Sequence, residues 1–207
     1  MNNDAALSVQ IPGRKQGTKA MENQDRLLIR CMQDGDDEVI LLGVSDGISQ
    51  CSYGGSVARW IIERHLATDE WFKPGDSIGE ALPSYLSALY QTFQAEFVDF
   101  PDMLDSGATV SVAAIHGEDI TCCWVGDSPI FLLTKTDKSY IAQLISRPDL
   151  ERVTGKLSDC FGKSAPCVFK TATLKASPGC VLVVATDGAK LDEGLLAGTL
   201  EQGYSQA

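Results

Sequence analysis

Two stretches of the chain share one pattern, a run of apolar residues that ends in an aspartate followed by a glycine. The first is VILLGVSDG at residues 39–47, and the second is VLVVATDG at residues 181–188. Continuous apolar runs of this length predict buried strands, so Asp46 and Asp187 are expected at strand ends. The pattern therefore predicts two carboxylates that two buried strands deliver to their tips, each with a glycine directly after it.

The segment before the first run predicts its hairpin partner. A strand is expected over residues 27–32, and Asp-Gly-Asp-Asp at residues 34–37 is typical of a hairpin turn. Antiparallel pairing across this turn places Asp25, at the start of the first strand, beside Asp46, at the end of the second. Asp25 therefore joins Asp46 and Asp187 as a candidate site residue.

The rest of the chain shows helical and strand-like periodicities in separate blocks. Apolar residues at helical spacing predict a helix after Gly54-Gly55 and another over residues 77–97. The remaining expected strands are at 6–11, 107–116, 120–125, 130–134, 139–144, 168–174 and 180–185, with a last helix over 191–202. We interpret the strands between residues 107 and 144 as an antiparallel meander. This segregation predicts an α+β fold in which helices pack on antiparallel sheets.

The composition of the chain limits which classes of partner and which cellular compartment are expected. The chain has 207 residues and a net charge of -11. Its length is typical of a single domain, and its acidity disfavours nucleic acid and anionic membranes as partners. The first residues lack the apolar core of a signal peptide, and no segment reaches the roughly 18 apolar residues that span a bilayer. We therefore expect one cytoplasmic domain over residues 1–207.

The candidate ligands favour hard cations over zinc. The chain has seven cysteines, no Cys-x-x-Cys pair and only two histidines, whereas zinc sites combine Cys and His ligands. We interpret the cysteines as core thiols in a reducing compartment. Buried carboxylates without a neighbouring Lys or Arg must take up protons or hold cations, and oxygen ligands favour Mn²⁺ or Mg²⁺. Two such ions suit the hydrolysis of phosphate esters, although each Asp-Gly by itself is also typical of a simple turn.

Five ordered motifs resemble the metal-dependent protein phosphatases of type 2C. They are ENQDR at 22–26, VSDGISQCSYGGSVA at 44–58, SGATVSVAAI at 106–115, WVGDSPIFLL at 124–133, and GKLSDCFG at 155–162 followed by VLVVATDG at 181–188. The resemblance covers residues 17 to about 190. It implies a four-layer αββα sandwich of two antiparallel sheets covered by helices, with metal ions at one end of the sheets.

The resemblance also implies roles for individual residues. Asp46 is expected to bridge two Mn²⁺ or Mg²⁺ ions, Gly47 to give its carbonyl oxygen to one of them, and Asp187 to bind the second. Asp25 is expected to hold metal-bound water. A metal-bridging hydroxide would then hydrolyse phosphoserine or phosphothreonine in a protein substrate, and a cognate serine/threonine kinase would be the opposing partner.

Two positions that depart from the family's pattern change the list of candidates. The family's phosphate-binding arginine falls on Ala20, which leaves Lys19 as the candidate phosphate-binding residue, without the bidentate fork of arginine. A third-metal aspartate is expected where Leu191 stands, so Asp192, with Asp105 as its partner, is the candidate third-metal site.

Two further departures bear on activity. The flap segment is reduced to about residues 146–156, which predicts an open site with loose substrate selection. The family's Asp-Asn motif on a late strand is not found before Ala207, so either the chain continues further or the second ion is held more weakly. The missing Asp-Asn motif and the missing phosphate-binding arginine favour an alternative, a pseudophosphatase or binding module that keeps the fold without turnover. The aspartates at 25, 46 and 187 favour the enzyme.

Overall fold

The protein is built on two antiparallel sheets. The computed structural model describes residues 23–137, 139–151, 154, 157–163 and 166–204. The larger sheet has the order β1-β2-β3-β4-β7, and its strands are β1 (Asp25–Asp34), β2 (Asp37–Asp46), β3 (Val110–His116), β4 (Asp119–Val125) and β7 (Lys170–Lys175). The smaller sheet has the order β6-β5-β8, and its strands are β5 (Ile130–Lys135), β6 (Tyr140–Leu144) and β8 (Val181–Val184).

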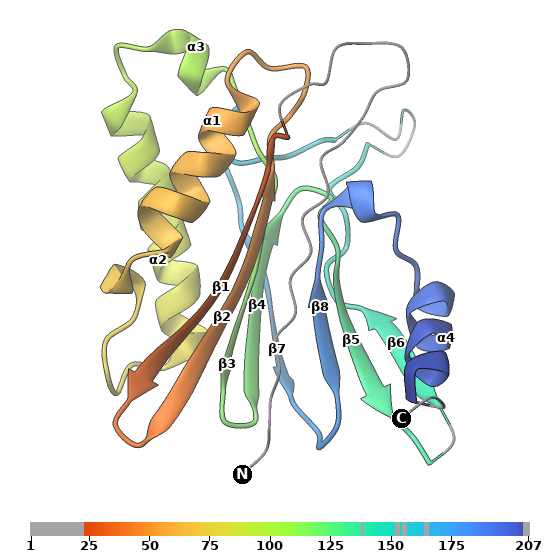
Figure 1. Cartoon of the computed structure of the whole chain (residues 1–207). Helices are drawn as coiled ribbons and strands as arrows, with labels where there is room; N and C mark the ends of the chain where they lie inside the picture. Colours follow the sequence, from red (N-terminus) through yellow and green to blue (C-terminus); the bar gives the residue numbers. More distant parts are fainter. Residues whose placement is uncertain (1–22, 138, 152–153, 155–156, 164–165, 205–207) are drawn as a thin grey trace.

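Helices cover the outer face of each sheet (Figure 1). On the larger sheet lie α1 (Gly54–Arg59), which continues as the π-helix η1 (Trp60–Leu66), and α2 (Ile78–Glu96). The smaller sheet is covered by α4 (Glu193–Tyr204). The short helices are η2 (Asp69–Trp71), α3 (Pro101–Leu104) and η3 (Asp187–Ala189). No helix in these described segments is long and apolar enough to cross a membrane.

Three hydrophobic clusters fill the three spaces between these layers. The first lies between the helices and the larger sheet, the second between the two sheets, and the third between the smaller sheet and α4. Representative members are Ile61 and Leu82 in the first, Cys122 and Leu132 in the second, and Leu133 and Leu196 in the third. The predicted α+β class and four-layer αββα sandwich are thereby confirmed.

Burial on both faces explains why the central strands are continuous apolar runs. In β4, Cys122 and Trp124 face the space between the sheets, whereas Cys123 and Val125 face the helices. Successive side chains of a strand point to opposite faces. A strand that is covered on both faces therefore has few positions at which a side chain can reach solvent, and most of its residues are apolar. Burial also raises the pKa of the Cys122 and Cys123 thiols to about 12, which keeps them protonated and unreactive. Cys31 is exposed, so the interpretation as core thiols is wrong for that residue.

The predicted meander is wrong at the turn after β4. Strands β3 and β4 pair in the larger sheet, whereas β5 and β6 pair in the smaller one, so the chain crosses between the sheets at residues 126–129. Gly126 makes this crossing with φ 102°, and a Cβ there would lie 2.8 Å from Cβ of Thr109. Strand periodicity cannot reveal such a crossing, because the pattern is the same in both sheets.

The remaining predicted elements agree with the structure to within a few residues. The helix predicted over 77–97 is α2, the one after Gly54-Gly55 is α1 with η1, and the last predicted helix is α4. The strand predicted at 6–11 lies outside the described residues.

Candidate metal centre

The β1–β2 hairpin brings the first two candidate aspartates together. Asp34 pairs with Asp37 next to the turn, and the register continues without a break until Asp25 lies opposite Asp46. Gly35 occupies the turn with φ 64°, which glycine adopts at no steric cost. The predicted juxtaposition of Asp25 and Asp46 is therefore present, and the turn chemistry of the hairpin produces it.

Asp187 approaches Asp46 from the smaller sheet. It follows β8 and begins η3, at the same end of the sheets as the start of β1 and the end of β2 (Figure 1). Burial raises the pKa of Asp46 to about 9, together with hydrogen bonding to, and negative charge on, first Asp25 and then Asp187. Thr186 Oγ1 donates a hydrogen bond to Asp25 Oδ2 at 3.2 Å and so joins the two sheets. The fold thus brings the other two predicted aspartates, Asp25 and Asp187, beside Asp46.

The backbone of Asp46 is fixed by Thr109, in the segment before β3. The Asp46 amide donates to Thr109 Oγ1 at 3.0 Å, and the Thr109 amide donates to the Asp46 carbonyl at 2.9 Å. Ser45 Oγ donates to the Thr109 carbonyl at 2.6 Å, and Thr109 Oγ1 lies 2.6 Å from Ser128 Oγ. This buried network explains why a Ser-Gly-Ala-Thr segment accompanies the strand end, since it holds the backbone of Asp46 in one place.

Gly47 allows helix α1 to begin directly against the site. A Cβ on Gly47 would lie 2.4 Å from the carbonyl carbon of Gly54, and a Cβ on Gly54 would lie 2.5 Å from the carbonyl oxygen of Ile48. Real Cβ atoms do not approach other heavy atoms this closely, so two glycines are required where the backbones meet. For Gly54 the close neighbour is the backbone of residues 47 and 48.

We predict that Gly47→Ala lowers the free energy of unfolding by about 2–3 kcal/mol, because the added methyl group must displace backbone rather than a flexible side chain. Gly198→Ala in α4 is the matched control. Among the described residues, no atom outside the backbone of α4 itself lies within 4 Å of a Cβ added there, so this variant is expected to raise stability by about 0.5–1 kcal/mol through helix propensity. Urea denaturation measures both changes. Equal effects of the two substitutions would contradict the close-approach argument.

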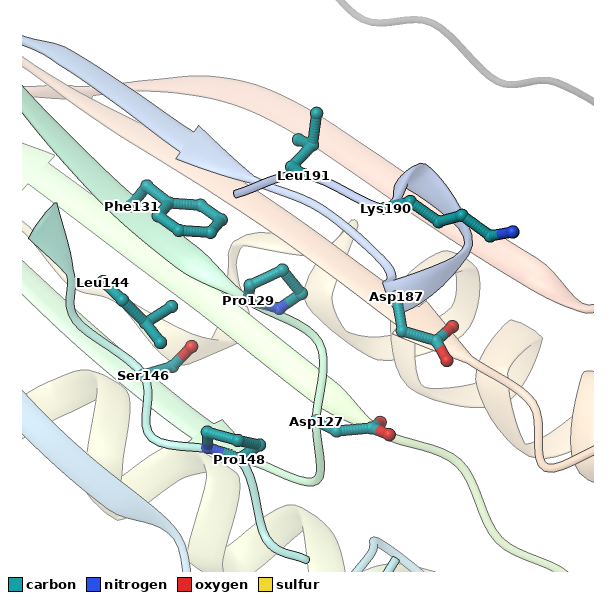
Figure 2. A pocket seen from close by; sticks show the side chains of 9 residues that line it. All are labelled: Asp127, Pro129, Phe131, Leu144, Ser146, Pro148, Asp187, Lys190 and Leu191. Atoms are coloured by element: carbon teal, nitrogen blue, oxygen red, sulfur yellow. The ribbon is translucent and has the colours of Figure 1, made fainter. Parts of the chain in front are cut away.

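A fourth aspartate, Asp127, lies beside Asp187 and was not predicted as a site residue. Burial, followed by the negative charge of Asp187, raises the pKa of Asp127. Both residues line a pocket of about 230 Å³, and their carboxylates extend toward the same side of it (Figure 2). The sequence carried a signal for Asp127, because the apolar run of β4 ends in Gly-Asp just as those of β2 and β8 lead to Asp-Gly.

Asp149 holds the turn that carries Asp127. Its side chain is 7% exposed, its Oδ2 accepts a hydrogen bond from the Gly126 amide at 2.9 Å, and its own amide donates to the Gly126 carbonyl at 2.9 Å. Its second carboxylate oxygen forms an ion pair with Lys170 on β7. The residue directly before Asp127 is therefore held at both its amide and its carbonyl.

We predict that Asp149→Ala destabilises the protein by about 2 kcal/mol, because charged hydrogen bonds to a buried group contribute roughly 1.5–3 kcal/mol. The matched control is Asp119→Ala, which removes the ion pair with Lys175 between side chains that are 48% and 70% exposed. That loss is expected to stay below about 0.5 kcal/mol. Thermal unfolding of both variants tests the difference. A loss of similar size in the two would show that Asp149 is no more than another surface ion pair.

The other predicted site residues form hydrogen bonds that do not involve Asp25, Asp46 or Asp187. Asp192 Oδ1 accepts a hydrogen bond from the Leu195 amide at 2.8 Å and so caps α4. Asp105 ends α3, and its carbonyl accepts a hydrogen bond from Cys51 Sγ at 3.7 Å. The structure places Asp127, which was not among the predicted residues, beside Asp187, and a third-metal role for Asp105 and Asp192 stays a prediction. Lys19 lies outside the described residues.

The chemistry of this centre fits hard divalent cations. The side-chain neighbours of Asp46 and Asp25 offer carboxylate oxygens, from Asp187, and hydroxyl oxygens, from Thr109 and Thr186. In the described part of the chain, neither Asp46 nor Asp187 forms an ion pair with Lys or Arg. Among those same residues, no three His, Cys, Asp or Glu side chains are already clustered as a metal site. Mutual repulsion of the carboxylates is what a bound Mn²⁺ or Mg²⁺ would relieve.

Solved structures share this fold. The serine/threonine phosphatase Stp1 from Staphylococcus aureus matches with a TM-score of 0.73 at 11% identity, over 95% of this chain and 86% of that one. The S. agalactiae serine/threonine phosphatase matches with a TM-score of 0.68 at 17% identity, over 89% and 80%. The catalytic domain of the serine/threonine protein phosphatase PstP, in complex with two manganese ions, matches with a TM-score of 0.61 at 18% identity, over 84% and 75%. At these identities the likeness shows the fold alone.

Sequence comparison identifies the family. No curated protein sequence matches the chain. The family model for protein phosphatase 2C matches residues 13–204, a range that includes the β1–β2 hairpin, the turn with Asp127 and both Asp-Gly strand ends. Because this match takes in nearly the whole chain, the chain belongs to the protein phosphatase 2C family.

Proposed function

We propose that this protein hydrolyses phosphoserine and phosphothreonine in other proteins and depends on Mn²⁺ or Mg²⁺. The observation that carries the proposal is the position of Asp46 between Asp25 and Asp187, where burial and two carboxylate neighbours raise its pKa to about 9. A carboxylate in such surroundings must bind a proton or a cation. Membership of the protein phosphatase 2C family supports the reaction class.

The same residues would hold the metal ions. Asp46 would be shared between two ions, Gly47 would offer its carbonyl oxygen to one, and Asp187 would bind the other. The two manganese ions of PstP, which has the same fold, support this number. When bound, the ions would supply a water molecule of lowered pKa as the nucleophile and offset the negative charge of the phosphoryl group.

The chain's own side chains would position the reactants. Thr109 fixes the backbone of Asp46 through two hydrogen bonds and so sets the position from which the shared carboxylate extends. Thr186 orients the carboxylate of Asp25, which lies across the hairpin from Asp46 and would accept a hydrogen bond from the attacking water. No covalent phosphoenzyme is required, which agrees with the two buried thiols of β4 staying protonated.

The substrate class implies further partners. Phosphorylated proteins would be supplied by a serine/threonine kinase, and we propose that both enzymes act in the cytoplasm. Lys19 stays the predicted phosphate-binding residue.

Hydrolysis of an aryl phosphate tests the proposal directly. We expect turnover by the full chain with added Mn²⁺, loss of turnover with a chelator, and recovery when Mn²⁺ is returned in excess. Turnover that persists in the chelator would rule out the metal-dependent reaction. Binding of Mn²⁺ and of phosphopeptide without turnover would favour the pseudophosphatase alternative instead.

A further inference from the structure

The pocket beside Asp127 and Asp187 has an apolar interior. Its apolar walls are formed by Pro129, Phe131, Leu144, Pro148 and Leu191, which come from the turn before β5, from β5 and β6, and from the segments that follow β6 and β8. The buried Ser146 also lines the pocket. Three of these side chains, Phe131, Leu144 and Leu191, belong to the hydrophobic cluster between the smaller sheet and α4, so the pocket is an open end of that cluster. Of these walls Phe131 is buried, Pro129, Leu144 and Leu191 are half-buried, and Pro148 is exposed. An apolar pocket next to a candidate metal centre is a feature that phosphate-ester chemistry alone does not require.

The rim of the pocket is polar and carries both charges. Figure 2 shows the carboxylates of Asp127 and Asp187 and the ammonium group of Lys190 extending in the same direction, away from the ring of Phe131. Within the described part of the chain, Lys190 forms no ion pair. A phosphoryl group held at the carboxylates through cations would therefore have a further positive charge on the same rim.

Lys190 is held in a strained conformation. Its φ of 50° and ψ of 40° are left-handed, and it is the one non-glycine residue with positive φ among those described. Its amide donates to the Asp187 carbonyl at 2.9 Å, so the strain occurs in the turn that also carries Asp187. Left-handed backbone is unfavourable for a residue other than glycine, and strain of this kind is concentrated at functional sites.

The size of the pocket limits what it can take. Pockets for drug-sized ligands measure roughly 300–1,000 Å³, whereas this one measures about 230 Å³. That space suits a single side chain better than a cofactor. Because the rim shares Asp127 and Asp187 with the candidate metal centre, a side chain attached to whatever binds there would reach the pocket.

We infer that this pocket binds the apolar side chain next to the phosphorylated residue of a protein substrate, while Lys190 contacts the phosphoryl group. The inference rests on the proposed function, since the phosphoryl group supplies the anchor. An apolar neighbour would remove the pocket walls from water, and the cation on the rim would offset the repulsion that a chain with a net charge of -11 exerts on an anionic peptide.

Binding of matched peptides tests the inference independently of turnover. The probes are fluorescent peptides with a non-hydrolysable phosphonate analogue of phosphothreonine, carrying either Leu or Gln directly before or directly after it. Fluorescence anisotropy with the Mn²⁺-loaded full chain measures their affinities. At one of the two positions, we expect Leu to bind about tenfold more tightly than Gln, the discrimination that an apolar pocket commonly gives.

Substitutions of pocket residues test whether the preference for Leu arises in this pocket. Leu144→Gln is expected to reduce the preference for Leu to below about threefold. Lys190→Gly, which suits the left-handed backbone, is expected to weaken both peptides by about fivefold, and Lys190→Arg to restore them. Lys73→Gly makes the same charge change on an exposed loop and is expected to leave both affinities unchanged. If thermal unfolding shows that Leu144→Gln is not folded, Pro148→Gln at an exposed wall position provides the same measurement.

The outcomes test the inferred role of the pocket separately from the proposed phosphatase activity. Equal affinity for Leu and Gln peptides at both positions, or a preference that survives both wall substitutions, would overturn the inference even if the protein hydrolyses aryl phosphate. A preference for Leu that depends on the pocket, in a protein that hydrolyses no phosphate ester, would support the pocket and overturn the proposed enzymatic function.

Discussion

Replacement of Asp46 by asparagine is expected to lower kcat/KM for Mn²⁺-dependent hydrolysis of an aryl phosphate by about a thousandfold, the upper range for loss of one electrostatic element of a preorganised site. The amide keeps the size of the side chain, and the hydrogen bonds between Thr109 and the Asp46 backbone do not involve the carboxylate. The substitution therefore removes the charge that two cations would share and leaves the strand end in place.

Asp36→Asn is the control for this experiment. It makes the same chemical change at an exposed position in the hairpin turn, at the opposite end of β2 from Asp46. Its rate is expected to equal that of the wild type. If the Asp46 variant is folded and retains more than about a tenth of the wild-type rate, Asp46 is not the shared ligand.

Removal of divalent cations is expected to destabilise the wild-type protein more at pH 8 than at pH 5. The folded-state pKa of Asp46 is about 9, above its ordinary value of 3.8. The proton on this carboxylate therefore contributes stability fully below about pH 4, and that contribution is lost as the pH rises toward 9. Cations that bind only the folded state restore stability, by about 2.7 kcal/mol at a hundred times their Kd.

Asp46→Asn is expected to reverse this behaviour. Without the carboxylate, the metal-free variant is more stable than the metal-free wild type at pH 8, and added Mn²⁺ stabilises it less. Thermal unfolding of both proteins at pH 5 and pH 8, with chelator and with Mn²⁺, measures the stability of each metal-free protein and its stabilisation by Mn²⁺. Equal stability of the two metal-free proteins at pH 8 would show that Asp46 is not held in a repulsive cluster.

The sequence was sufficient to predict the central part of the candidate site. The Asp-Gly-Asp-Asp turn determines the hairpin register, and that register alone places Asp25 opposite Asp46. The apolar runs before Asp46 and Asp187 predicted their strands, because strands that are covered on both faces have few polar positions. These features are local, so no knowledge of the tertiary arrangement was required.

Asp127 and Asp149 were missed because their positions depend on tertiary structure. The turn at Gly126 was interpreted as a link within one meander, whereas it carries the chain from the larger sheet to the smaller one. Asp149 lies in a segment that was predicted only as a short flap, and its partners are distant in sequence. Side chains that meet across two sheets leave no periodic signal in either strand.

Calorimetric titration of the metal-free full chain with Mn²⁺ tests the central claim most directly, because the claim is that Asp25, Asp46 and Asp187 form a site for divalent cations. The account predicts saturable binding of two ions by the wild type, loss of binding in Asp46→Asn, and unchanged binding in Asp36→Asn. No binding by the wild type, or equal binding by the wild type and Asp46→Asn, would contradict it.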